Sequence, residues 1–220
     1  MCGRTSLFVP RTELEGRFDA TVADPASYSP RYNIAPTEPL AILEAESAEI
    51  EQVTWGIPGA GGQRHINARI ETVDERPTFS DAWQERPCLV LSSGFYKWGD
   101  RSNGGRAQPY RIYRPDDVAF AMAGIVESTE KGRAMAILTR EANDVLRPIH
   151  DRMPVVLSRA TERAWLQADP DERKHLPGTG DSLEAYQVDS RMNNASIDDP
   201  SIIEPLEHDQ ADLSAFDQSS

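Results

Sequence analysis

The chain has 220 residues and a mass of 24.4 kDa, a length that fits one domain with a sizeable core, with or without a tail. Its formal net charge of −13 argues against indiscriminate DNA binding, because sequence-independent affinity depends on cations that neutralise phosphates. The last 24 residues hold seven acidic residues and no lysine or arginine, so residues 1–196 carry only −6. Of the 23 basic residues 20 are arginine, whose planar guanidinium suits phosphate recognition.

The number of cysteines and the hydropathy of the sequence further limit the class of protein and its cellular compartment. Cys2 and Cys88 are the only cysteines, and they lack paired metal-ligand spacing. They therefore predict neither a disulfide framework nor a metal site, and we expect no cofactor. The longest apolar run, residues 118–126, is too short to cross a bilayer, and no signal-peptide pattern is seen. We expect a soluble, cytoplasmic protein without a membrane partner.

The first element of interest is the start of the chain, Met1–Arg4. A small residue after an initiator methionine generally permits its removal, so Cys2 is expected to become the mature N-terminus. Its α-amine (reference pKa about 7.7–8.0) and its thiol (about 8.5) would then both be partly deprotonated near neutral pH. Such an aminothiol condenses with an aldehyde to an imine, which the thiol closes to a thiazolidine. Two alternatives are attack of the thiol on an amide carbonyl and a buried cysteine without chemistry.

In the first half of the chain, a helix that a proline opens is predicted at residues 10–18, followed by a stiff loop with four prolines at 25–39. Two strands at 40–43 and 50–55 are predicted to form a hairpin. A flexible glycine-rich turn at 56–62 and a strand of mixed polarity at 65–72 follow.

The second half is richer in strands. Because strands outnumber helices without a regular β-α alternation, we expect an α+β fold with a largely antiparallel, barrel-like sheet core and short flanking helices. The domain is predicted to span residues 1–196, and residues 197–220 to form an acidic, disordered tail. The predicted elements are strands at 88–91, 110–113, 118–125, 134–138, 155–157 and 185–188, and helices at 78–83, 141–146 and 161–168.

Six short motifs carry the polar residues that suit a reactive site. Taken singly, each has an ordinary structural explanation: asparagines occur in turns and caps, arginines in ion pairs, and a lone histidine as a hydrogen-bonding group. Together and in this order, they resemble the SRAP family, the SOS response-associated peptidases, which shield abasic sites in DNA. The resemblance covers about residues 2–196 and rests on Met1–Arg4, Asn33–Thr37, Trp55–Pro58, Asn67–Thr72, Gly94–Trp98 and His150–Pro154.

The resemblance implies an enzyme of the DNA-damage response that senses abasic sites in single-stranded DNA and forms a thiazolidine DNA–protein crosslink through the N-terminal cysteine. It also implies a peptidase activity that releases residues preceding this cysteine, with lyase activity as a further expectation. The matching catalytic positions are the nucleophile Cys2, Asn67 for holding the sugar and His150 for proton transfer. The matching contacts to phosphate and sugar are Arg4, Asn33, Arg69, Thr139 and Arg152. We expect a monomer.

Two positions depart from the family pattern. Lys97 stands where the family usually has a glutamate that acts as acid and base. A lysine replaces it only if burial or neighbouring positive charge lowers its pKa, so we expect Lys97 to remain in the catalytic site and to change the rate of ring closure or release. Residues 59–62 are Gly-Ala-Gly-Gly where members commonly carry aromatic residues that stack on bases.

Two other functions stay open from the sequence. One is an N-terminal nucleophile amidohydrolase that acts on small amides. The other is a non-catalytic DNA-binding homologue, which the substitution at Lys97 and the acidic charge would favour.

Overall fold

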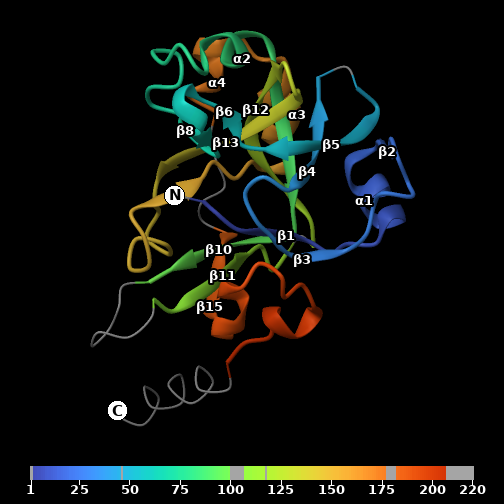
Figure 1. Ribbon diagram of the computed structural model, residues 1–220, viewed down its shortest axis with the longest axis vertical. Helices are drawn as coiled ribbons and strands as arrows, with labels where there is room; N and C mark the ends of the chain where they lie inside the picture. Colours follow the sequence, from blue (N-terminus) through green and yellow to red (C-terminus); the bar gives the residue numbers. More distant parts are fainter. Residues whose placement is uncertain (1, 46, 100–106, 117, 177–181, 207–220) are drawn as a thin grey trace.

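The computed structural model describes residues 2–45, 47–99, 107–116, 118–176 and 182–206 (Figure 1). At its centre five strands pair into a closed circuit, in which four pairings are antiparallel and that of β13 with β5 is parallel. The parallel pairing joins Ala134 to Thr54 and Met135 to Trp55 and so closes the barrel. The five strands are β4 (Pro39–Glu44), β5 (Glu49–Trp55), β9 (Pro87–Ser92), β12 (Phe120–Thr129) and β13 (Gly132–Glu141).

Short strands extend this barrel where the site motifs lie. β14 (Arg152–Pro154) pairs antiparallel with one end of β13, and β8 (Asn67–Arg69) pairs parallel with β13 on its other edge. β2 (Thr21–Val22) pairs with β5, and β6 (Ile57–Pro58) forms a small hairpin with β7 (Arg64–His65). β13 thus brings two motifs, one on β8 and one leading into β14, close together in space.

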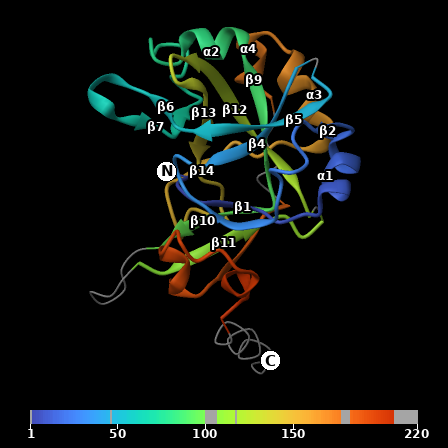
Figure 2. The same ribbon diagram turned by 45° about the vertical axis from the view of Figure 1, so that its right-hand side comes forward.

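A second, fully antiparallel sheet holds the start of the chain. Its order is β15 (Glu184–Gln187), β11 (Pro109–Tyr113), β10 (Gly94–Trp98), β1 (Thr5–Leu7) and β3 (Arg31–Ile34). In both views this sheet lies below the barrel strands (Figures 1 and 2), and the Asn67 amide on β8 donates a hydrogen bond to the Cys2 carbonyl at 2.7 Å. The two sheets therefore meet at the N-terminal end of β1.

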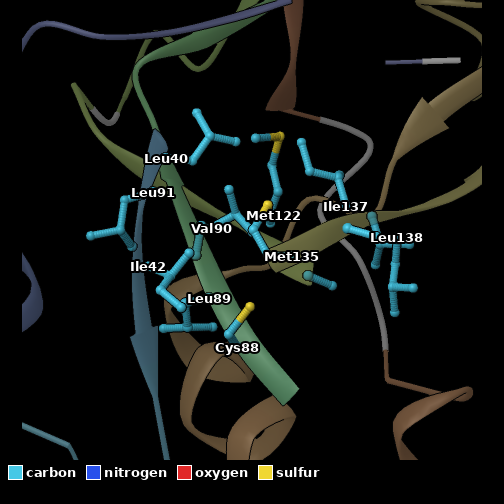
Figure 3. Packing of buried hydrophobic residues seen from close by; sticks show 14 of the residues in the cluster. Leu40, Ile42, Cys88, Leu89, Val90, Leu91, Met122, Met135, Ile137 and Leu138 are labelled. Carbon is cyan, nitrogen blue, oxygen red and sulfur yellow. The ribbon is translucent and has the colours of Figure 1, made fainter. Parts of the chain in front are cut away.

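The main core fills the barrel. Side chains from β4, β9, β12 and β13 converge there, among them Leu40, Val90 and Met122, which are fully buried (Figure 3). Each such side chain stabilises the fold by about 1.5–3 kcal/mol relative to an exposed one. β9 is buried along its whole length because α3 covers its outer side, where the Trp165 indole donates a hydrogen bond to the Cys88 carbonyl at 3.0 Å. This explains why β9 has no polar alternation in its sequence.

The helices are short and lie outside the sheets. α3 begins with a reciprocal cap between Ser158 and Thr161, which satisfies backbone N–H groups that have no partner within the helix. No helix among the described residues is long and apolar enough to cross a membrane. The helices are α1 (Arg11–Phe18), α2 (Ser80–Glu85), α3 (Arg159–Gln167) and α4 (Pro170–Arg173), with 3₁₀ turns at Ala60–Gly62, Ser190–Asn193 and Pro200–Ile203.

The predicted α+β class with a barrel-like, largely antiparallel core is confirmed. Three local predictions are wrong. Residues 141–146 form no helix, because β13 continues to Glu141 to pair with β14 and the chain then turns. Residues 31–34, predicted as loop, form β3 through pairing with β1. Residues 155–157, predicted as a strand, form only an isolated bridge to β12, between Val156 and Met122, and the regular strand lies earlier, as β14.

Residues 197–206, predicted to belong to a disordered tail, pack against the domain. Asp198 accepts hydrogen bonds from the backbone N–H groups of Tyr32 (2.5 Å) and Asn33 (2.9 Å), and its carboxylate pairs with Arg31. Ile202 is fully buried in a second small core under the β10–β11–β15 end of the sheet. The acidic residues near 198 therefore belong to the fold, while residues 207–220 of the predicted tail lie outside the described residues.

Candidate active site

Cys2 lies at the junction of the two sheets and is fully buried. β1 positions it through its pairing with β10, which continues as a hydrogen bond from the Tyr96 N–H to the Arg4 carbonyl at 3.0 Å. From β8, the Asn67 side-chain amide donates a hydrogen bond to the Cys2 carbonyl at 2.7 Å. Sequence-distant strands thus hold the residue that was predicted to be the nucleophile.

Lys97 lies on β10 and is also fully buried. Its Nζ has no hydrogen-bond partner among the described residues. Burial lowers the pKa of its ammonium group, and the positive charge of Arg152 acts in the same direction, while the charges of Cys2 and Asp151 oppose the change. The direction of this change is the one that a lysine in place of the family glutamate would need.

The Cys2 thiol faces a similar environment. Burial raises its pKa, and the positive charge of Lys97 partly offsets this increase. Its Sγ donates a long hydrogen bond of 3.9 Å to the Arg4 carbonyl oxygen. The buried position therefore favours the protonated thiol over the thiolate.

Two of the buried polar atoms that lack a hydrogen-bond partner among the described residues lie beside this cysteine. Asn67 Oδ1 is buried without a hydrogen-bond partner among the described residues, as is Lys97 Nζ. Buried polar atoms are nearly always paired in folded proteins, because leaving one unpaired costs about 1–3 kcal/mol. An unpaired acceptor on Asn67 and an unpaired amine on Lys97, both beside Cys2, are what a site prepared for a polar ligand would show.

The loop before β14 carries the predicted histidine. The Nδ1 atom of His150 lies 2.7 Å from Asp151 Oδ1 and 3.0 Å from the backbone nitrogen of Arg152. A protonated Nδ1 can donate to the carboxylate, and an unprotonated Nδ1 can accept from the backbone N–H. Each protonation state thus finds a partner, which suits proton transfer. This loop acts on the site electrostatically, because the charges of Asp151 and Arg152 influence the pKa of Lys97.

Arg152 is held in place by Glu71 and Thr139. Its guanidinium donates two hydrogen bonds of 2.8 Å to the Glu71 carboxylate and one of 2.7 Å to the Thr139 carbonyl. Partial burial alone would raise the pKa of Glu71, but the hydrogen bonds and charge of Arg152 hold it below its usual value. Glu71 thus neutralises much of the charge that Arg152 would offer to a phosphate. The sequence contained Glu71 within a motif without revealing this role.

Two predicted DNA contacts are buried. Asn33 is fully buried: its amide donates to the carbonyls of Met192, Asn194 and Ile197, and its Oδ1 accepts from Arg4 at 2.6 Å. The geometry gives Asn33 a structural role and does not favour a direct DNA contact.

Thr139 is only 2 % exposed, and its hydroxyl donates to the Ala68 carbonyl at 3.3 Å. Arg69, in contrast, is exposed on β8 and shares a strand face with Asn67.

The β6–β7 hairpin departs from the family pattern in the way that its sequence predicts. Its tip carries Gly61 and Gly62, both with positive φ, and no aromatic ring. A ring lies at its base instead, where His65 packs edge-on against Phe79 at 5.5 Å between centroids. A Cβ at Gly59 would lie 2.3 Å from the His65 imidazole, so this glycine is required by the close approach of that ring.

His150 and Arg152, at the rim of the site, keep part of their surface exposed. The side chains of His150 and Arg152 are 27 % and 12 % exposed, whereas Cys2 and Lys97 have no exposed surface. A surface hollow of about 410 Å³ lies beside Glu71, lined also by Ile70 and Arg140. The peptide bond of Met1 occupies the Cys2 nitrogen. Removal of Met1 therefore turns this nitrogen into a free α-amine.

Comparison with known proteins defines the class. Residues 1–195 match the family described as SOS response associated peptidase (SRAP), and the chain belongs to this family. The match covers β1, β8, β10 and β14, the strands that hold Cys2, Asn67, Lys97 and the His150 loop.

Individual relatives agree with this assignment. The chain is 33 % identical over 223 residues to the abasic site processing protein YoqW of Bacillus subtilis, covering 93 % of this chain and 99 % of that protein. It is 30 % identical over 181 residues to the abasic site processing protein YedK of Escherichia coli, covering 77 % and 81 %. A crystal structure of a protein from Bacteroides thetaiotaomicron has the same fold, with a TM-score of 0.80 at 22 % identity, covering 93 % and 100 %.

Proposed function

We propose that this protein processes abasic sites in single-stranded DNA by forming a thiazolidine crosslink through Cys2 after Met1 is removed. The observation that supports this most directly is that the buried Cys2 lies beside two polar atoms without hydrogen-bond partners among the described residues. These atoms are Asn67 Oδ1 and Lys97 Nζ. The names of the relatives, abasic site processing proteins, agree with it.

The reaction follows from the chemistry of an aminothiol. The α-amine nitrogen of Cys2 attacks the aldehyde carbon C1′ of the open-chain sugar, and loss of water gives an imine. Sγ then adds to the imine carbon, its proton passes to the nitrogen, and a five-membered ring closes. No second substrate and no oxidant are needed. In this scheme Asn67 fixes the Cys2 carbonyl and offers Oδ1 to a sugar hydroxyl, and His150 carries protons.

A DNA-binding face is proposed at the rim, where Arg69 and Arg152 lie on strands that flank β13. Replacing the exposed Arg69 by alanine is expected to weaken binding to single-stranded DNA uniformly across sequences. One lost phosphate contact lowers the slope of log K against log salt by about 0.7. Fluorescence anisotropy over a salt series measures this. Arg163→Ala, on the exposed side of α3, is the matched control, and equal slopes for the two variants would contradict the assignment.

The crosslink itself has a direct test. The purified protein is incubated with an abasic single-stranded oligonucleotide and examined for a heat-stable adduct on a denaturing gel. We expect the wild type to form the adduct and Cys2→Ala to lose it, because the ring needs the sulfur. Cys88→Ala is the matched control, since Cys88 is buried inside the barrel with a pKa raised well above the usual range.

Three outcomes decide between the functions considered. A Cys2-dependent adduct supports the crosslinker. DNA binding without an adduct supports the non-catalytic binder, and hydrolysis of small amides without an adduct supports the amidohydrolase. Intact-mass measurement of the same sample establishes whether Met1 is absent, and a retained Met1 would block the amine on which ring closure depends.

We further infer that the peptidase activity in the family name corresponds to release of residues preceding Cys2. A monomeric state and a cytoplasmic location stay predictions for size-exclusion chromatography and imaging to examine.

A further inference from the structure

Lys97 is unusual among the lysines of this chain. Lys174 donates to Asp74 at 2.6 Å, and Lys131 is exposed at the β12–β13 turn, as is usual for lysine. Lys97 is fully buried, and no described carboxylate accepts a hydrogen bond from its Nζ. A buried cation normally has a partner, because an unpaired charge away from water is strongly destabilising. Lys97 therefore occupies the site as an amine that the fold does not neutralise by pairing.

We propose that Lys97 is a second amine nucleophile, which forms a reversible imine with the same sugar aldehyde that Cys2 captures as a ring. The proposal rests on the proposed function, because it needs the aldehyde to enter this site. It differs from the role of the family glutamate, since a carboxylate moves protons but cannot form an imine.

The position of Lys97 carries the argument. It lies on β10, the strand that pairs with β1 and so holds Cys2, and the charges that act on it belong to Cys2 and to the loop residues Asp151 and Arg152. An aldehyde placed for the Cys2 amine is thereby placed near a second amine. Burial lowers the pKa of Lys97, so more of it carries the free electron pair that nucleophilic attack requires.

The step balances without any further reactant. The Nζ electron pair attacks C1′, the carbonyl oxygen takes a proton, and the resulting carbinolamine loses water to give the imine. Lysine has no thiol on the carbon next to its amine-bearing carbon, so this imine cannot close to a thiazolidine. It is released by water, or by attack of the Cys2 α-amine on the same carbon, which returns Lys97 as a free amine. Lys97 would thus hold the sugar until Cys2 closes the ring.

The difference in stability between the two adducts provides the test. Sodium cyanoborohydride reduces an imine to a stable amine, so a lysine adduct becomes visible only with reductant. The Cys2→Ala variant is incubated with an abasic single-stranded oligonucleotide with and without cyanoborohydride, and the adduct is located by peptide mass spectrometry. Mapping is needed because the N-terminal residue of this variant also presents an α-amine once Met1 is removed.

We expect a reductant-dependent adduct in Cys2→Ala on the peptide that contains Lys97. Adding Lys97→Arg, which keeps the charge but forms no imine, should reduce this peptide adduct by at least about tenfold. Lys97→Met serves as a second variant should arginine disturb the fold, and circular dichroism checks both. Lys131→Arg is the matched control and should leave the adduct unchanged.

Two results would overturn the proposal. One is trapping confined to the N-terminal peptide. The other is no trapping in Cys2→Ala although the wild type forms its heat-stable adduct, which would leave the proposed function intact. Failure of the wild type to form any adduct would instead reject the proposed function, so the two failures are distinguishable.

Discussion

Replacing Asn33 by leucine is expected to lower the free energy of unfolding by about 2–4 kcal/mol, because a buried hydrogen-bonded group is lost and its partners stay buried. The Asn33 amide donates to the carbonyls of Met192, Asn194 and Ile197 at 3.2, 3.1 and 2.7 Å, and Oδ1 accepts from Arg4 at 2.6 Å. Leucine has similar volume but satisfies none of them. Urea unfolding followed by tryptophan fluorescence measures the change.

The Asn33→Leu substitution should also affect the active site through Arg4. Arg4 lies between Cys2 and β1, and its guanidinium depends on Asn33 Oδ1 and on the Met192 carbonyl at 3.0 Å. Loosening Arg4 should slow adduct formation at a temperature where the variant is still folded. Asn194→Ala is the control, since its exposed side chain caps only a local turn and should change stability by at most about 1 kcal/mol. Equal stability of Asn33→Leu and this control would refute the structural role of Asn33.

Lys97→Met is expected to stabilise the protein at neutral pH by about 1–3 kcal/mol, although it removes a residue from the proposed site. The substitution replaces a buried amine without a described partner by an apolar chain of similar length. Stabilisation of this kind is common where a residue serves activity at the expense of the fold. Thermal and urea unfolding of both proteins measure it, with Lys131→Met as the exposed control.

The gain should depend on pH with a defined sign. The pKa of Lys97 is lower in the folded protein than the value of 10.5 for a free lysine, so the unfolded chain binds more protons between these two values. Wild-type stability therefore rises, relative to the variant, as the pH passes upward through this window. The advantage of Lys97→Met is largest below the folded-state pKa and smallest above 10.5. A difference that stays constant with pH would show that Lys97 keeps an ordinary pKa.

Much of the fold could be predicted from local patterns. The strands predicted at 40–43 and 50–55 form the β4–β5 hairpin, and the helix predicted at 161–168 appears as α3, shifted by a residue or two. The errors occurred where pairing with distant residues decides the conformation. β3 exists because β1 lies beside it, and residues 141–146 turn because β13 continues into its pairing with β14.

The prediction of a disordered tail from acidic composition failed for the same reason. Residues 197–206 look like part of an acidic, disordered segment, because their charge has no local partner. Asp198 finds its partners in Arg31 and in the backbone of Tyr32 and Asn33, more than 160 positions earlier in the sequence. A window along the chain cannot detect hydrogen bonds of that kind.

For the site, the sequence by itself determined the chemistry that is available: an aminothiol once Met1 is removed, an amide at Asn67, an imidazole at His150 and an amine at Lys97. Ordered motifs indicated the family because several of them had to agree. Only the tertiary structure decided which groups meet and in what state. Pairing of β1 with β10, and of β8 and β14 with β13, places Cys2 beside Asn67 and Lys97. Hydrogen bonds to the carbonyls of residues 192–197 hold Asn33 in a buried position. Whether a group is desolvated and paired depends on neighbours distant in sequence, and this determines its pKa and its reactivity.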